Sequence, residues 1–121
     1  MRLAALAFLS LLSAAASARA AGSDLEFYTG EDLYAQCSAN PADADYQPRQ
    51  ARCVGYVIGA SDALQAAQGG GRPAMACLQP TNGAPQLVAA VQQYLAAHPE
   101  KRRLAAHDLV DEALAAAFPC R

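Results

Sequence analysis

Residues 50–67 have the sequence QARCVGYVIGASDALQAA, which holds the clearest periodic pattern in the chain. Its apolar residues recur at spacings of four, three and four: Cys53, Val57, Ala60 and Leu64. That spacing is the stripe of a helix with 3.6 residues per turn. We therefore predict a helix over residues 50–67 that buries this stripe.

Glycines inside and after this helix lead to two further predictions. Gly55 and Gly59 lie one turn apart within it, where each costs up to about 1 kcal/mol relative to alanine. Glycine at such positions indicates close approach by another backbone, so we predict a tight helix crossing. Residues 69–71 are all glycine and end the helix. A phosphate-binding loop would need a strand before it and a helix after it, so we interpret them as a flexible loop.

Three more helices are predicted from their terminal signals. Thr29 can cap the first of them, and Pro85 suits the first turn of the next. The predicted spans run from Thr29 to about residue 40, from Pro85 to His98, and from about Leu104 to Phe118. No segment shows the alternation or the β-branched enrichment of a strand. The sequence thus predicts an all-α fold, a small four-helix array with short connections.

The first twenty residues are typical of a cleaved export signal. Met1-Arg2 is a short positive region, an apolar run follows over residues 3–12, and small residues come after it. The run is shorter than the roughly 20 apolar residues of a membrane span, so we expect no membrane anchor. We predict a Sec signal peptide over residues 1–20, with a cut after Ala18 as the alternative. The mature domain, residues 21–121, is then periplasmic.

All four cysteines lie in the predicted mature domain: Cys37, Cys53, Cys77 and Cys120. An even count in a short exported chain indicates disulfides, which help to stabilise a domain this small. Zinc binding is the competing interpretation, but it favours close C-x-x-C pairs, and no two cysteines here are closer than Cys37 and Cys53. Four cysteines allow three pairings, of which we predict Cys37–Cys53 and Cys77–Cys120.

The charge of the chain argues against nucleic acid as a partner. Without Arg2 and Arg19, seven basic residues remain beside eleven acidic ones, for a net charge of −4. Nucleic-acid binding rests on many clustered lysines and arginines, and residues 101–103 are the only such cluster in the sequence. We therefore expect no nucleic-acid partner.

The sequence also lacks the usual groups of an enzyme. His107-Asp108 is the best acid–base candidate, with Asp111 one helical turn further on. The same spacing gives an ordinary solvated helix pair, which is our interpretation. No serine sits in a nucleophile-elbow pattern, and the two histidines have no thiolate nearby. We predict no enzyme activity, no catalytic or metal-binding residue and no cofactor.

Several short motifs occur in a fixed order along the mature chain: Gly30-x-x-Leu33-x-x-x-Cys37, Cys53-Val54-Gly55-Tyr56-Val57-x-Gly59-x-x-Asp62-Ala63, Cys77-Leu78-x-Pro80, Gln86-Leu87, Tyr94-Leu95-x-x-His98-Pro99-Glu100 and Ala113-Leu114-x-x-Ala117-Phe118-Pro119-Cys120. Their combination resembles the Rap/Tai family of immunity proteins associated with type VI secretion. The resemblance covers residues 30–120. Two loops differ from the family pattern, since residues 40–50 form a longer connection and an extra residue precedes Pro80.

This resemblance implies a small periplasmic helical protein, often a homodimer, that needs no catalytic group of its own. Its partner would be a peptidoglycan-amidase effector, a papain-like cysteine peptidase that cuts the peptide stems of the wall. The immunity protein would block the active-site cleft of this effector and so protect the cell's own wall.

A blocking protein would insert a protruding loop, with arginine or aromatic anchors, into the effector's groove. Two loops could serve: residues 69–75, with Arg72 and Met75, and residues 98–103, with His98, Lys101 and Arg102. Each can equally be a plain solvent-exposed connection. The alternative function is a periplasmic chaperone or envelope binding module without a dedicated effector, which would bind many clients weakly and more strongly in acid.

Overall fold

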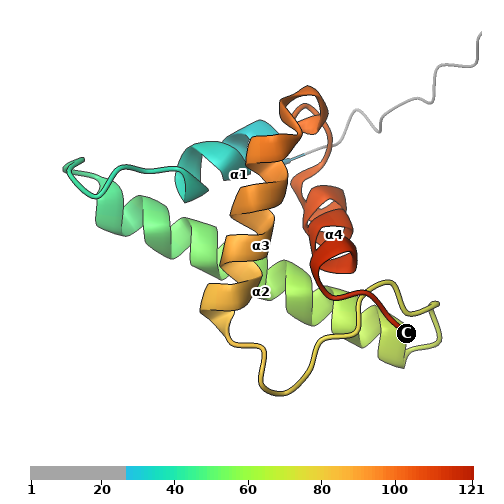
Figure 1. Ribbon diagram of the computed structural model, residues 1–121. Coiled ribbons are helices and arrows are strands. Elements are labelled where there is room, and N and C mark those ends of the chain that lie inside the picture. Colours follow the sequence, from blue (N-terminus) through green and yellow to red (C-terminus); the bar gives the residue numbers. More distant parts are fainter. Residues whose placement is uncertain (1–26) are drawn as a thin grey trace, which may run out of the picture.

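The computed structural model describes residues 27–121, so the predicted signal peptide and its cleavage site lie outside the described residues. Four α-helices and one short 3-10 helix follow one another (Figure 1): α1 Gly30–Cys37, α2 Tyr46–Gly69, α3 Ala84–Ala97, η1 Pro99–Lys101 and α4 Ala106–Ala117. Within this part of the chain there is no strand, only an isolated bridge between Thr29 and Ala105. The predicted all-α, four-helix fold is confirmed.

The core forms where α1, α3 and α4 pack against one side of α2. From α2, the predicted stripe supplies Cys53, Val57 and Leu64, all buried, with Ala60 at its half-buried edge. The large side chains that are almost completely buried come from all four helices: Leu33, Val57, Val91, Leu95, Leu109, Val110 and Leu114. Several small residues, such as Ala106 and Ala113, are also buried and let the helices approach closely.

The first helix begins with a reciprocal pair of hydrogen bonds. Thr29 Oγ1 accepts from the backbone N–H of Asp32 at 3.2 Å, and Asp32 Oδ2 accepts from the Thr29 N–H at 2.9 Å. These two bonds satisfy two donors that would otherwise be free at the helix start. The hydrogen bond from the Thr29 backbone lowers the pKa of Asp32. The predicted cap at Thr29 is confirmed.

Gly30 marks the tightest backbone approach in the described structure. Its N–H donates to the Leu104 carbonyl at 2.8 Å, and the next N–H, of Glu31, donates to the Arg102 carbonyl at 2.7 Å. A Cβ at position 30 would lie 2.3 Å from Leu109 Cδ1 and 2.9 Å from the Arg102 oxygen. Because the backbone around Leu104 binds α1, α4 begins at Ala106 rather than at the predicted Leu104.

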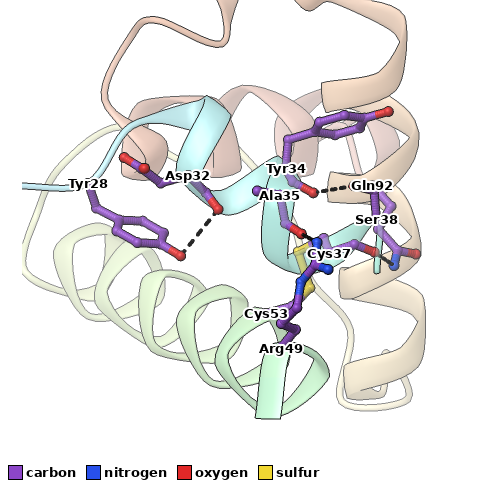
Figure 2. The surroundings of a disulfide bond; sticks show 9 residues. All are labelled: Tyr28, Asp32, Tyr34, Ala35, Cys37, Ser38, Arg49, Cys53 and Gln92. Atoms are coloured by element: carbon purple, nitrogen blue, oxygen red, sulfur yellow. Dashed lines mark hydrogen bonds between the residues drawn. A yellow bond between two sulfur atoms is a disulfide. The ribbon is translucent and has the colours of Figure 1, made fainter. Parts of the chain in front are cut away.

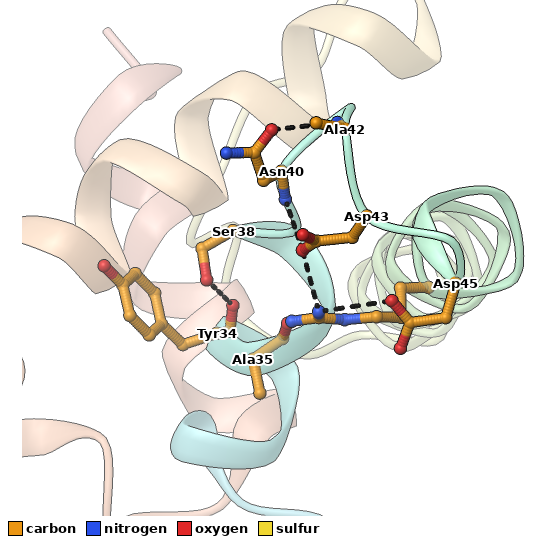
Figure 3. Close-up of polar contacts among 8 residues, drawn as sticks. Tyr34, Ala35, Ser38, Asn40, Ala42, Asp43 and Asp45 are labelled. Atoms are coloured by element: carbon orange, nitrogen blue, oxygen red, sulfur yellow. Dashed lines mark hydrogen bonds and ion pairs between the residues drawn. The ribbon is translucent and has the colours of Figure 1, made fainter.

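The long helix α2 begins at Tyr46, four residues before the predicted start. Pro48 lies in its first turn. Proline is tolerated there, because backbone N–H groups in the first turn have no hydrogen-bond partner within the helix. Arg49 then holds the preceding turn: its Nη1 lies 3.6 Å from Asp43 and 3.7 Å from Asp45. Its Nη2 donates to the Ala35 carbonyl of α1. Figure 3 shows this polar cluster between the two helices.

Both predicted disulfides are confirmed. Cys37, the last residue of α1, is bonded to Cys53 in α2, and both are buried (Figure 2). Cys77, in the connection after α2, is bonded to Cys120 beyond α4. Beside the first bridge, Gln92 Nε2 of α3 donates to the Cys37 carbonyl at 2.7 Å. The first bridge therefore ties α1 to α2 at a point that α3 also contacts.

The predicted tight crossing at Gly55 and Gly59 is wrong. Both glycines are exposed, and a Cβ built at either would meet nothing within 4 Å. They lie on the face of α2 opposite the buried stripe, where alanine would be favoured by about 1 kcal/mol at each position. The close backbone approach falls instead at Gly30, whose partners are more than 70 residues further along the chain and so leave no local pattern.

The clash at Gly30 predicts a large effect of adding one methyl group. Gly30→Ala should lower the free energy of unfolding by about 2 kcal/mol or more, because neither the Arg102 backbone nor Leu109 can move freely. Urea denaturation followed by circular dichroism measures this. Gly69→Ala is the control, since a Cβ there has open space and α2 ends at that residue. Equal stability of the two variants would contradict the close approach.

The two disulfides close loops of different length, with separations of 16 and 43 residues. The loop-entropy relation predicts losses of about 3 and about 4 kcal/mol when they are removed. We expect the double variants Cys37→Ala/Cys53→Ala and Cys77→Ala/Cys120→Ala each to lose about this much in urea denaturation. A loss below about 1 kcal/mol for either pair would show that its bridge is not a structural constraint.

Candidate functional site

The loop after α2 is exposed but firmly anchored. The side-chain oxygen of Gln68 accepts from the backbone N–H groups of Met75 and Ala76 at 2.8 and 3.1 Å, and its amide nitrogen donates to the Ala76 carbonyl at 3.0 Å. Gly71 has a φ of +104°, a backbone conformation that favours glycine. At the far end, the Cys77 N–H donates to the Phe118 carbonyl at 2.8 Å. Residues 69–76 therefore form a defined loop.

Arg72 and Met75, the predicted contact residues of this loop, are both exposed. Met75 is among the few large apolar side chains with a high exposed fraction, 42%. Arg72 lies close enough to Asp111 of α4 for its charge to lower the pKa of that carboxyl, against the larger raising effect of burial. The arginine and the thioether are thus presented to solvent on an anchored loop.

The second predicted loop, residues 98–103, is engaged in contacts within the chain. Lys101 Nζ lies 2.7 Å from Glu112 Oε2 and 2.9 Å from the Tyr94 hydroxyl, and that hydroxyl also donates to Glu112. The hydrogen bond from Lys101 is the largest cause that lowers the pKa of Glu112. The bond to Glu112 is likewise the main cause that raises the pKa of Lys101. This triad fixes the loop to α3 and α4.

His98 and Arg102 are also held by internal contacts. The His98 ring stacks on Tyr94 with 4.1 Å between centroids, and its Nδ1 lies 2.8 Å from the Tyr94 carbonyl. The Arg102 guanidinium lies 3.4 Å from the centroid of the Tyr34 ring, and its Nε donates to the Leu95 carbonyl at 2.7 Å. Only 15% of the Arg102 side chain is exposed.

In Figure 1 the first loop lies at the C-terminal end of α2, near the C terminus of the chain, whereas the second follows the C-terminal end of α3. The structure therefore does not bring Arg72 and Met75 together with Lys101 and Arg102. One loop presents its side chains to solvent, and the other uses them to hold the fold.

The acid–base candidate of the sequence is a surface pair. His107 Nε2 lies 3.1 Å from Asp108 Oδ1, and about two thirds of each side chain is exposed. Among residues 27–121, no group of three potential metal ligands is close enough to bind a metal. Over the same range, no helix has the length and apolar character that crossing a membrane requires.

Three open hollows mark the surface of residues 27–121. A groove of about 520 Å³ runs between α3 and α4. Its lining is rich in alanine and also includes Tyr94 and Phe118. A second hollow of about 490 Å³ adjoins it beside Phe118 and the Cys77–Cys120 bridge. A third, of about 360 Å³, lies between α2 and α4.

Residues 27–121 thus form a small helical domain that is linked by two disulfides. The chain belongs to a family described as Rap1a immunity proteins, whose family model matches residues 29–120. An immunity protein acts against an effector, so the family implies a protein partner. Comparison with curated proteins found no match, and comparison with solved structures found none either.

Residues that shape this surface were missed from sequence because their roles depend on distant partners. Gln68, Glu112 and Arg49 are ordinary exposed helix residues by pattern. Gln68 closes the Arg72 loop eight residues ahead, and Glu112 pairs with Lys101 of another element. No spacing rule relates such partners.

The Glu112 triad predicts a pH-dependent contribution to stability. Because the folded protein lowers the pKa of Glu112, this contribution is present above the carboxyl's unfolded pKa and is lost as pH falls through the folded value. Glu112→Gln should therefore be less stable than the wild type at pH 7, and the difference should shrink as the pH is lowered towards 3. Thermal unfolding from pH 3 to 7 tests this. A constant difference over that range would rule out the ionised triad.

Proposed function

We propose that this protein is a periplasmic immunity protein that binds a peptidoglycan-amidase effector of type VI secretion and blocks its active site. The family match over residues 29–120 is the observation that carries the proposal. The export-signal pattern of residues 1–20 and the two disulfides support the periplasm, since disulfides persist in oxidising compartments.

The loop of residues 69–76 is the element we propose to enter the effector's cleft. Its arginine and methionine are exposed, while Gln68 and the Cys77–Cys120 bridge hold its ends. An anchored loop loses little conformational entropy on binding, which increases affinity. Arginine is also one of the residue types that most often dominate protein interfaces.

Residues 98–103 take a different role in this proposal. Lys101 and Arg102 each contact an aromatic ring and a carbonyl or carboxylate of the same chain. Using them for an effector would break these contacts. They therefore position the end of α3 and the start of α1. The homodimer implied by the resemblance stays a prediction, which light scattering of the purified protein tests.

Capture of an effector tests the proposed function. The exported protein, recovered from the periplasm in its oxidised form, is immobilised and exposed to the secreted proteins of its source strain at neutral pH. We expect retention of one cell-wall amidase, whose release of peptide stems from purified peptidoglycan stops on binding. Weak retention of many unrelated proteins, increasing in acid, would instead support the chaperone alternative.

The role of the loop is tested with the same amidase. Arg72→Ala/Met75→Ala should weaken binding by about tenfold or more, because both side chains are exposed anchors. Arg103→Ala removes an exposed arginine from the other loop, which follows α3, and should leave affinity unchanged. Isothermal titration measures both. The reverse pattern would assign the contact to residues 98–103.

A further inference from the structure

The outward face of α2 carries a feature that packing within the chain does not explain. Gly55 and Gly59 lie on this face with open space around them, although alanine would favour the helix at both positions. Val54, on the same turn, is 37% exposed. The absence of side chains at the glycines opens the third hollow described above, which we call the glycine hollow.

The glycine hollow has a defined lining. Gly55, Tyr56, Gly59 and Ala60 of α2 form one side, and His107 of α4 forms the other, around about 360 Å³. The Tyr56 ring also contacts Tyr28, with 4.9 Å between the ring centroids. The hollow thus combines a bare backbone floor with an aromatic wall.

Two carboxylates of α4, Asp108 and Asp111, lie near this wall without lining the hollow. Burial raises the pKa of Tyr56, and the negative charges of Asp108 and Asp111 raise it further. Asp108 contacts His107 in the lining, and Asp111 lies one turn beyond His107 on the same face of α4. Asp111 is half-buried, and within residues 27–121 it forms no ion pair. Arg72 acts on Asp111 only from the neighbouring loop.

We infer that the glycine hollow receives one cationic side chain, an arginine or lysine, from the effector that this protein binds. The aromatic face of Tyr56 attracts a cation, and the carboxylates of Asp108 and Asp111 supply acceptors for its N–H groups. The two glycines leave room for the long aliphatic stem beside α2. This inference rests on the proposed function, because it names a second contact of the same partner.

The hollow and the Arg72 loop lie on neighbouring parts of the surface. The charge of Arg72 reaches Asp111, and Asp111 flanks the hollow through His107. One partner can therefore contact both, with its acidic groups against Arg72 and a basic group in the hollow. Complementary charges of both signs fix the orientation of an interface as well as its affinity.

The chemistry of the hollow is tested first without the effector. The oxidised exported protein is titrated with N-acetyl-arginine amide, and with N-acetyl-citrulline amide as the uncharged control of the same shape. Backbone amide resonances of Gly55 and Gly59 are followed by NMR. We expect saturable shifts with arginine at millimolar concentration, and binding of citrulline about tenfold weaker or absent. Equal responses to both probes, or no response to either, would overturn the inference.

Variants separate the hollow from the fold. Gly59→Leu should abolish the arginine response, because its side chain fills the open space, and Asp111→Asn should weaken it. Gly59→Ala should keep or raise the melting temperature while it weakens arginine binding. If Gly59 were needed for the fold, the same variant would lower both the melting temperature and the binding. Ala96→Leu, on an exposed position of α3, is the matched control and should bind arginine normally.

The captured amidase provides the second test. Gly59→Leu should weaken its binding by about tenfold or more, and Ala96→Leu should not. Undiminished inhibition by Gly59→Leu would overturn the role of the hollow and leave the proposed function standing. Failure to capture any amidase would overturn the proposed function, while the arginine titration still decides the chemistry of the hollow. Concentration-dependent shifts of Gly55 and Gly59 without ligand would assign this face to a second copy and overturn the inference.

Discussion

The fold depends on closing the chain at both ends of α2. A domain of this size buries a limited apolar core, and several core positions here are alanines that contribute little area. The Cys37–Cys53 bridge fixes α1 to the first half of α2, and the Cys77–Cys120 bridge joins the segment after α2 to the end of the chain. Because the Cys77–Cys120 bridge and Gln68 hold the loop of residues 69–76, this loop can be exposed to solvent and still keep a defined shape. A binding surface requires both properties.

Glycine has two opposite uses in this chain. At Gly30 it lets α1 approach the backbone of residues 102–104, where even a methyl group has no room. At Gly55 and Gly59 a Cβ would meet nothing within 4 Å, and glycine weakens the helix that contains it. The first use serves the fold. The second has no role in packing within the described residues, and our proposal assigns it to the partner, together with the Arg72 loop.

Local patterns in the sequence were sufficient for the four helices. The α2 stripe, the Thr29 cap and the prolines at 85 and 99 each report on a few consecutive residues, and each agrees with the structure. The tight approach at Gly30 was not predictable, because it depends on residues more than 70 positions away. The site shows the same contrast. The exposure of Arg72 and Met75 could be predicted from their glycine-rich loop. The contacts of Lys101 with Glu112 and of Arg102 with Tyr34 could not, because they require the packing of three helices.

Immunity is a property of cells, so contact-dependent competition tests the central claim most directly. A strain that lacks this protein would be grown in contact with its parent, with and without a plasmid that restores the full chain. Protection by an otherwise identical chain that lacks residues 1–20 would be measured alongside. We predict that the deletion strain is outcompeted, that the full chain rescues it, and that the shortened chain does not. Equal survival of the deletion strain and its parent would contradict the assignment as an immunity protein against a wall-degrading effector.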